Sequence, residues 1–128
     1  MEADIQGAQR KVFSSEVRPR GGTFDEAGIR VRKGSSLPFS VRREWSAPAG
    51  HYPEVWFLVD PETREVLYEG PTRDVLVWGL QSLTELTDEV TVPIALRPGN
   101  HKIVFALGGL KGGEIDVPVS EEPAESAA

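Results

Sequence analysis

Residues 90–107, VTVPIALRPGNHKIVFAL, carry the clearest structural signal in the sequence. Val92, Ile94 and Leu96 alternate with other residues, which is the two-residue period of a half-buried strand. The tetrapeptide RPGN follows, and its proline and glycine occupy the positions that these residues favour in a type II turn. The alternation resumes over 103–107. The segment therefore predicts two strands joined by a tight turn.

The same rhythm extends through the rest of the chain. Short apolar runs rich in valine, isoleucine and aromatics are separated by turn residues at spacings of about 8–12 residues, which is typical of a sandwich or barrel. We expect an all-β fold, an antiparallel β-sandwich of seven to nine strands. The DPET sequence at 60–63 predicts a hairpin turn, and GGLKGG at 108–113 predicts the loop before the last strand. The other strand candidates are 12–13 with Val17, 29–31, 37–41, 55–59, 66–68, 75–78 and 115–119.

One segment has a different period. Leu80, Leu83 and Leu86 fall on one side of a helical turn, so the sequence predicts one short helix near 80–87.

Length and charge limit the organisation and the partners. The chain has 128 residues, a formal net charge of −6 and no cysteine. This length supports one core, so we expect a flexible segment at 1–9, one domain at 10–119 and an acidic tail at 120–128. The negative charge disfavours nucleic acid and anionic lipid as main partners, since both attract cations. No apolar run approaches the roughly 20 residues that span a bilayer, so we expect a cytoplasmic protein without membrane insertion.

Motifs for catalysis are absent. The two histidines, His51 and His101, have no second ligand at a metal-binding spacing, and no serine-nucleophile or phosphate-loop pattern occurs. We therefore expect that the protein is not an enzyme and has no catalytic residue, metal site or cofactor. A site built around either histidine stays open as a third hypothesis, and it requires a carboxylate within hydrogen-bond distance of the ring.

Basic and aromatic residues of the first half suggest a binding surface. Arginines outnumber lysines and concentrate there, and Arg30 and Arg32 project from one face of their predicted strand. Arginine favours bidentate contacts with carboxylates, while aromatic rings at a loop offer flat contact faces. The predicted partner-binding residues are Arg30, Arg32, Arg42, Arg43, Trp45 and Tyr52. The arginine face could instead bind the acidic tail of the same chain.

The segment at 90–107 also resembles a recurring ending of immunoglobulin-like and PEGA-like β-sandwiches. In those families a strand leads into Leu-x-Pro-Gly-x-(Tyr/His)-x-(Ile/Val)-x-(Phe/Val), and the aromatic residue after the turn braces the corner between strands. The matching residues here are Leu96, Pro98, Gly99, His101, Ile103 and Phe105. The resemblance implies an immunoglobulin-like sandwich, a fold that serves adhesion, carbohydrate binding, enzyme accessory and assembly roles.

These observations favour a non-catalytic protein-interaction module, an accessory subunit that docks on a larger protein or multi-subunit complex. The alternative is a carbohydrate-binding module that stacks sugars on Trp45, Tyr52 and Trp78. That alternative requires at least two of the three rings to be exposed and coplanar.

Overall fold

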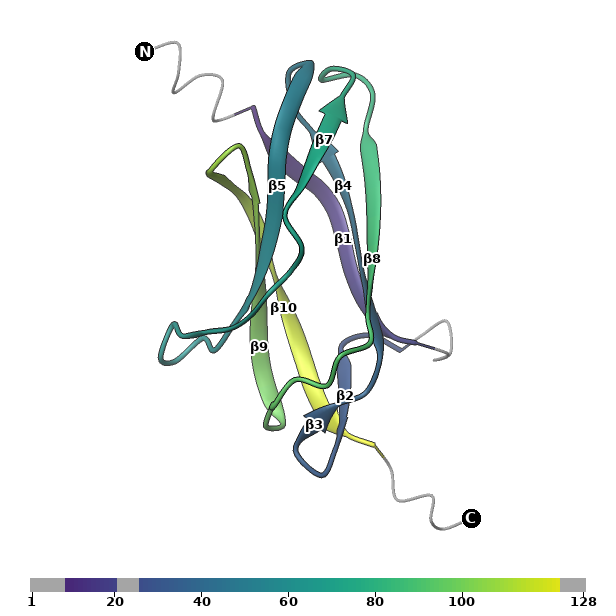
Figure 1. The fold of residues 1–128 in the computed structure, drawn as a ribbon, viewed down its shortest axis with the longest axis vertical. Helices are drawn as coiled ribbons and strands as arrows, with labels where there is room; N and C mark the ends of the chain where they lie inside the picture. The colour runs from purple at the N-terminus through teal and green to yellow at the C-terminus, as the bar shows by residue number, and fades with distance from the viewer. Residues whose placement is uncertain (1–8, 21–25, 123–128) are drawn as a thin grey trace.

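The computed structural model describes residues 9–20 and 26–122, and within them the chain is all-β (Figure 1). No described segment forms a helix, so none of these residues builds a helix long and apolar enough to cross a bilayer. The strands are β1 (Lys11–Pro19), β2 (Ile29–Arg32), β3 (Ser35–Ser36), β4 (Phe39–Ser46), β5 (Gly50–Val59), β6 (Val66–Glu69), β7 (Arg73–Val77), β8 (Thr84–Val90), β9 (Gly99–Leu107) and β10 (Leu110–Glu121).

The first of two sheets has three strands in the order β1-β4-β8, all antiparallel. Its central strand β4 alternates between buried and half-buried positions along its whole length. Phe39, Val41, Arg43 and Trp45 face the interior, because successive side chains of a strand point to opposite faces. An arginine thus takes an inward position between a valine and a tryptophan.

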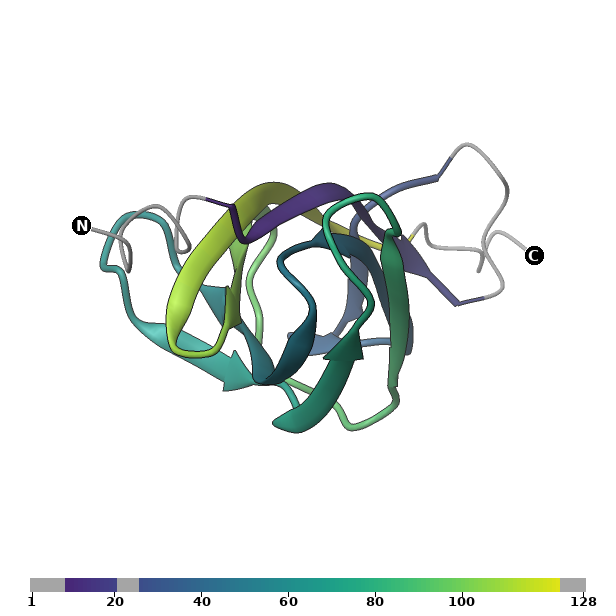
Figure 2. The same ribbon diagram turned by 90° about the horizontal axis from the view of Figure 1, so that it is seen from above.

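The second sheet has seven strands in the order β3-β2-β10-β9-β5-β6, with β7 paired to β5 beside this path. The long strand β5 pairs with β9 on one edge and divides its other edge between two partners. Its first half, from Gly50 to Glu54, pairs with β7, and Phe57 to Val59 pair with β6. Only β10 and β2 run parallel. Seen from above, the two sheets curl around one interior (Figure 2).

That interior is filled by alternating apolar residues from both sheets, whose burial supplies the main favourable free energy of folding. In β9, His101, Ile103, Phe105 and Leu107 are buried in succession, as the predicted two-residue period requires. The largest fully buried apolar side chains are Trp45, Trp56, Phe39, Phe105, Ile29, Leu58, Ile103 and Leu107.

Two turn predictions are confirmed, one of them with a change in length. The 60–63 turn joins β5 to β6, and the Asp60 Oδ1 atom accepts the N–H of Glu62 at 2.9 Å, an Asx turn. The loop predicted at 108–113 is shorter, because Gly108 and Gly109 alone form the connection with φ values of +61° and +81°. Two successive positive φ angles suit a two-residue hairpin turn, so β10 already begins at Leu110.

The short helix predicted near 80–87 is wrong. The residues from Thr84 onward form β8, which pairs with β4 over seven residues. A helix of two turns is marginal on its own, whereas pairing with β4 gives β8 a continuous hydrogen-bond ladder. The described residues form ten strands where seven to nine are predicted, and the two-residue β3 is among those not predicted.

The strand predicted over 90–96 is also wrong beyond Val90, where β8 ends. Pro93 has no N–H to donate to a ladder. The segment instead contacts β3 and the turn before it through single hydrogen bonds. The Ile94 N–H donates to Ser36 Oγ at 2.9 Å, and the Leu96 N–H donates to Gly34 O at 3.0 Å. Ile94 is buried, but Val92, predicted on the same face, is 52% exposed. Of the predicted terminal segments, 1–8 and 123–128 lie outside the described residues.

Candidate functional site

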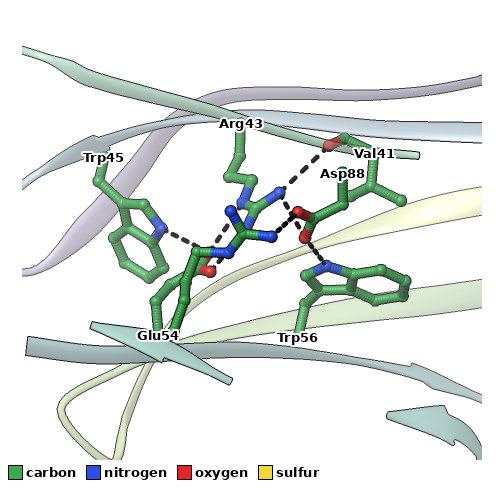
Figure 3. A network of polar contacts seen from close by, with 7 residues as sticks. Val41, Arg43, Trp45, Glu54, Trp56 and Asp88 are labelled. Atoms are coloured by element: carbon green, nitrogen blue, oxygen red, sulfur yellow. Dashed lines mark hydrogen bonds and ion pairs between the residues drawn. The ribbon is translucent and has the colours of Figure 1, made fainter. Parts of the chain in front are cut away.

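The interior contains a charged cluster that links the two sheets (Figure 3). Arg43 of β4 is fully buried, and so is Glu54 of β5 in the opposite sheet. The guanidinium donates two parallel hydrogen bonds to this carboxylate, from Nε to Oε2 at 2.7 Å and from Nη2 to Oε1 at 2.6 Å. Such bidentate pairs are the strongest ion pairs that side chains form, because both bonds are charge-assisted.

A second carboxylate, Asp88 of β8, extends the cluster towards the surface. Arg43 Nη1 lies 3.1 Å from Asp88 Oδ2, and the half-exposed Arg73 of β7 forms an ion pair with Asp88 Oδ1. Two indoles complete the shell, because Trp45 Nε1 donates to Glu54 Oε2 at 3.0 Å and Trp56 Nε1 donates to Asp88 Oδ2 at 2.8 Å. We call Arg43, Glu54, Asp88, Arg73, Trp45 and Trp56 the buried cluster.

The formal charges of the buried cluster cancel, with two arginines against two carboxylates. A buried charge is tolerated only when it is paired and hydrogen bonded, and here each carboxylate receives both an arginine and an indole N–H. Since its three most buried charged groups are shielded from solvent and engaged with one another, the cluster suits a structural role. It joins β4 and β8 of one sheet to β5 and β7 of the other.

Two glycines make room for the indoles. A Cβ atom at Gly112 of β10 would lie 2.2 Å from Trp45 Cζ3, and one at Gly70 would lie 2.4 Å from Trp56 Cε2. Both distances are far below van der Waals contact, so these positions accept only glycine without a shift of the ring. The second glycine pair of the GGLKGG segment thus serves packing in β10.

The predicted partner-binding residues do not form one surface. Arg43 and Trp45 are fully buried, which removes both from any surface contact and corrects that part of the prediction. Their position follows from the alternation of β4, which sends every second side chain inward. Tyr52 is half-buried, and its hydroxyl donates to Pro48 O at 2.8 Å while Arg10 lies 4.6 Å above the ring.

The remaining three arginines are engaged with carboxylates of the same chain. Arg42, on the outer face of β4, contacts Glu44 and donates to Glu85 Oε2 at 2.9 Å. The hydrogen bond with Glu85 raises the pKa of Arg42 above its ordinary value. Arg30 binds Glu26, and Arg32 binds Glu122 at the start of the acidic tail. The alternative that the tail meets the arginine face therefore holds for this one residue.

His51 lies near the start of β5, and His101 lies near the start of β9, beside the end of β5. His51 Nδ1 is 3.2 Å from Asp74 Oδ2, so the carboxylate required by the enzyme hypothesis is present, but both side chains are about two-thirds exposed on an open strand surface. His101 is buried, and its Nδ1 lies 3.3 Å from the carbonyl of Gly99.

A pocket of about 560 Å³ lies beside His101, between the β5–β6 turn and the 95–100 segment. Its lining includes Asp60, Glu62, Glu65 and Arg97. The backbone N–H groups of Glu62 and Thr63 lower the pKa of Asp60 below its ordinary value, which keeps this carboxylate ionised as part of the turn. Within the described part of the chain, no group of three or more acidic, histidine or cysteine residues is arranged to hold a metal ion.

The most distinctive surface feature was not recognised in the sequence. Eight large apolar side chains of the described residues are exposed, and four of them lie in the stretch from Leu76 to Leu83, where β7 leads into β8 at the upper end in Figure 1. Trp78 is the most exposed of all, at 73%. We call Leu76, Trp78, Leu80 and Leu83 the β7–β8 corner.

Two features of the sequence explain why the exposure of the β7–β8 corner is not predicted from it. In β7, Val75 and Val77 are buried while Leu76 is exposed, and Trp78, directly after the strand, is exposed as well. Buried and exposed positions therefore alternate, although all four residues are apolar. A strand that is apolar at each of its last positions indicates burial on both faces, and only the structure shows one face uncovered. Leu80 and Leu83 were assigned to the predicted helix.

Comparison with known proteins bears on the fold. No protein-family model matches the sequence, and no curated protein is significantly similar to it. The structure is similar to that of the Pseudomonas fluorescens alkylpurine DNA glycosylase AlkC bound to DNA containing an abasic site analogue. The TM-score is 0.54 at 12% identity, over 90% of this chain and 34% of the glycosylase chain.

A second solved structure, the β-glucosidase from Listeria innocua in complex with isofagomine, gives a TM-score of 0.49 at 13% identity over 84% of this chain and 16% of that chain. At such identities the likeness concerns the fold alone. This chain spans 34% of the length of the glycosylase chain and 16% of the length of the glucosidase chain.

Proposed function

We propose that this protein is a non-catalytic interaction module, an accessory subunit that docks on a larger cytoplasmic protein or complex through the β7–β8 corner. The observation that carries the proposal is the concentration of exposed apolar side chains at 76–83. Contiguous exposed apolar surface is uncommon on monomeric proteins and marks interaction sites. Tryptophan is also the residue type most enriched among the residues that dominate binding energy.

The energetic argument is simple. Full burial of an exposed large apolar side chain contributes about 1.5–3 kcal/mol. Trp78 is 73% exposed, while Leu76, Leu80 and Leu83 are 41%, 44% and 43% exposed, so docking would add less than this value for each leucine. The six residues predicted as the surface offer less, because two are buried and the others already have partners within the chain. Docking through those arginines would first require their present ion pairs to break.

The fold supports an accessory role and a sandwich of the immunoglobulin-like type. A similar fold makes up about a third of the AlkC glycosylase chain, 34% by coverage, so this architecture also exists as a component of a larger protein. We also propose that the two sheets belong to the immunoglobulin-like class, because the Leu96-x-Pro-Gly-x-His segment leads into β9 and His101 is buried near the start of that strand. Binding of DNA is not carried over, since the net charge here is −6.

The carbohydrate-binding alternative is less well supported. Of its three rings, Trp45 is buried, Tyr52 is half-buried beneath Arg10, and Trp78 alone is exposed. A stacking platform of two coplanar exposed rings is therefore not available from these residues. A flat tryptophan-fluorescence response to a panel of glycans is the expected result.

Affinity-tagged protein expressed in its own cells tests the docking proposal. We expect the wild type to co-purify with a stoichiometric partner and the variant Trp78→Ser/Leu80→Ser/Leu83→Ser to lose it. The matched control is Val66→Ser/Val92→Ser, which removes exposed apolar side chains elsewhere, each 52% exposed in the wild type. Equal recovery with both variants, or a stable monomer without partner, would contradict the proposal.

A further inference from the structure

We infer that β7 binds its partner by accepting an extended strand of that partner along its free edge. This inference rests on the proposed function and specifies how the β7–β8 corner would be used. Five residues of β7 pair with β5, from Arg73 opposite Glu54 to Val77 opposite Gly50. No other described strand pairs with β7, because β8, which follows it along the chain, belongs to the other sheet (Figure 1).

The register identifies the backbone groups that the free edge presents. The Pro53 carbonyl accepts the N–H of Gly108 at 2.7 Å on the β9 side, so residue 53 directs its backbone groups away from β7. In an antiparallel pair, hydrogen-bonded and non-hydrogen-bonded positions alternate, so Arg73, Val75 and Val77 are bonded to β5. Asp74 and Leu76 then direct their N–H and C=O groups to the free edge.

The other free edges are protected in ways that β7 is not. Natural sheets protect edges by short strands, bulges and charges. Strand β3 has two residues, β6 has four and a shifted register with β5, β1 carries a bulge between Val12 and Ser14, and β8 presents exposed Glu85 and Glu89. Strand β7 carries the charged Arg73 and Asp74 at its start, but its register with β5 is uninterrupted, its Leu76 is exposed and apolar, and the exposed Trp78 follows directly after the strand.

Charge and pattern define the occupant. An added strand would lay every second side chain beside Asp74 and Leu76 and would continue towards Trp78, which follows the end of β7, so it should be apolar near the last two and basic near Asp74. A second copy of this chain fits less well. Antiparallel pairing of two β7 edges brings no basic side chain opposite Asp74, because Arg73 points inward to Asp88, and each copy carries a net charge of −6. The occupant is therefore an extended partner segment with alternating apolar residues and a lysine or arginine.

A displayed library of random linear peptides, selected on the wild-type protein, tests this inference. We expect selected peptides to alternate apolar residues and to contain a basic residue. Binding of a synthetic selected peptide should slow amide hydrogen exchange at Asp74 and Leu76. Failure to select any peptide, or binding without protection of these two amides, would overturn the inference. Concentration-dependent protection without peptide would assign the edge to a second copy instead.

The matched variants are Leu76→Pro and Leu76→Ala. Both remove the leucine side chain, but the proline also removes an N–H that faces the free edge and makes no bond to β5. We expect the proline variant to bind the selected peptide about tenfold more weakly than the alanine variant, since a lost hydrogen bond leaves its partner unsatisfied. Equal affinities would overturn the inference. The exchange measurement on the wild type gives a second result that does not depend on either variant folding.

These results separate the inference from the proposed function. Loss of the native partner in the Trp78→Ser/Leu80→Ser/Leu83→Ser variant but not in Leu76→Pro would support docking at the corner and overturn strand addition. Loss of the partner in both variants, with Leu76→Ala retaining more of it, would support both. Retention in all three would overturn both.

Discussion

The buried cluster and the β7–β8 corner reverse the usual distribution of polar and apolar residues. Arg43, Glu54 and Asp88 lie inside the molecule, while Leu76 and Trp78 lie outside. The two regions differ in whether their side chains are paired or covered by other residues of the chain. The three buried charges Arg43, Glu54 and Asp88 are paired within the chain, whereas the described residues leave the side chains of the corner partly or largely exposed. A group that already has its partners serves the fold, and a group left without them is available for binding.

The three tryptophans show the same contrast between buried residues with partners and an exposed residue. Trp45 and Trp56 are buried and donate their N–H groups to Glu54 and Asp88, whereas Trp78 is 73% exposed. Burial of a tryptophan normally requires a partner for its N–H, and the buried carboxylates provide one for each ring. Residue type alone therefore does not distinguish a core residue from a binding residue in this protein.

The largest expected effect comes from breaking the buried cluster. Arg43→Met leaves Glu54 without its arginine and Asp88 with one arginine fewer, so we expect the free energy of unfolding to fall by about 3–5 kcal/mol, as for other broken buried pairs. Urea denaturation followed by circular dichroism measures this change. The control is Arg42→Met on the outer face of the same strand, where loss of exposed ion pairs should cost about 0–1 kcal/mol.

Comparable losses for Arg43→Met and Arg42→Met would mean that the interior pairs contribute no more than surface pairs. The contrast between the two regions would then lose its energetic basis.

A smaller effect is expected from filling the space beside Trp45. Gly112→Ala places a methyl group 2.2 Å from the indole, so the ring or β10 must shift, at a cost of about 1–3 kcal/mol. Thermal unfolding of the variant measures the loss. Gly113→Ala is the neighbouring control, because its methyl group would lie 3.3 Å from Val12 Cβ, a much milder contact. If the two variants were equally stable, the close fit around Trp45 would not matter for the fold.

The last comparison is between two tryptophans, and the smallest effect is expected at Trp78. Trp56→Phe keeps an aromatic ring but removes the N–H that binds Asp88, so we expect a loss of about 1–3 kcal/mol from the poorly satisfied carboxylate. Trp78→Phe should change stability by less than about 0.5 kcal/mol, as is usual at exposed positions. Denaturant titrations of both variants under one condition provide the measurement. An equal loss at the two positions would show that Trp78 also stabilises the chain.

Much of the fold could be predicted from the sequence, because strand periodicity is a local property. The two-residue period locates β9 and the later part of β10, and the turn residues locate the 60–63 connection. The helix prediction rested on the spacing of Leu80, Leu83 and Leu86 and is wrong. Leucine spacing cannot show that Thr84 to Val90 pair with the edge of β4, which lies about 40 residues earlier in the chain. In the predicted strand over 90–96, the two-residue period correctly predicts burial of Ile94 and Leu96. The segment still forms no strand, because its neighbour β3 gives it one isolated bridge and no regular ladder.

The candidate site was less predictable. Alternation within β4 places Arg43 on the same face as Val41 and Trp45, which was a usable signal for burial. Nothing local to that strand indicates that Glu54 and Asp88, from two other strands, meet the guanidinium. Without those partners a surface position was the reasonable prediction for an arginine.

The sequence by itself determined the chemical alternation, the 60–63 turn, the glycine turn that begins at Gly108 and the absence of cysteine, because these depend only on neighbouring residues along the chain. The tertiary structure decided which charges pair inside, which apolar side chains stay uncovered and which strand edge stays free. These are non-local properties, since they depend on which distant strands come together. For this reason Arg43 is buried and Trp78 is exposed, the opposite of what their residue types suggest: the fold brings two carboxylates to Arg43 and leaves Trp78 73% exposed.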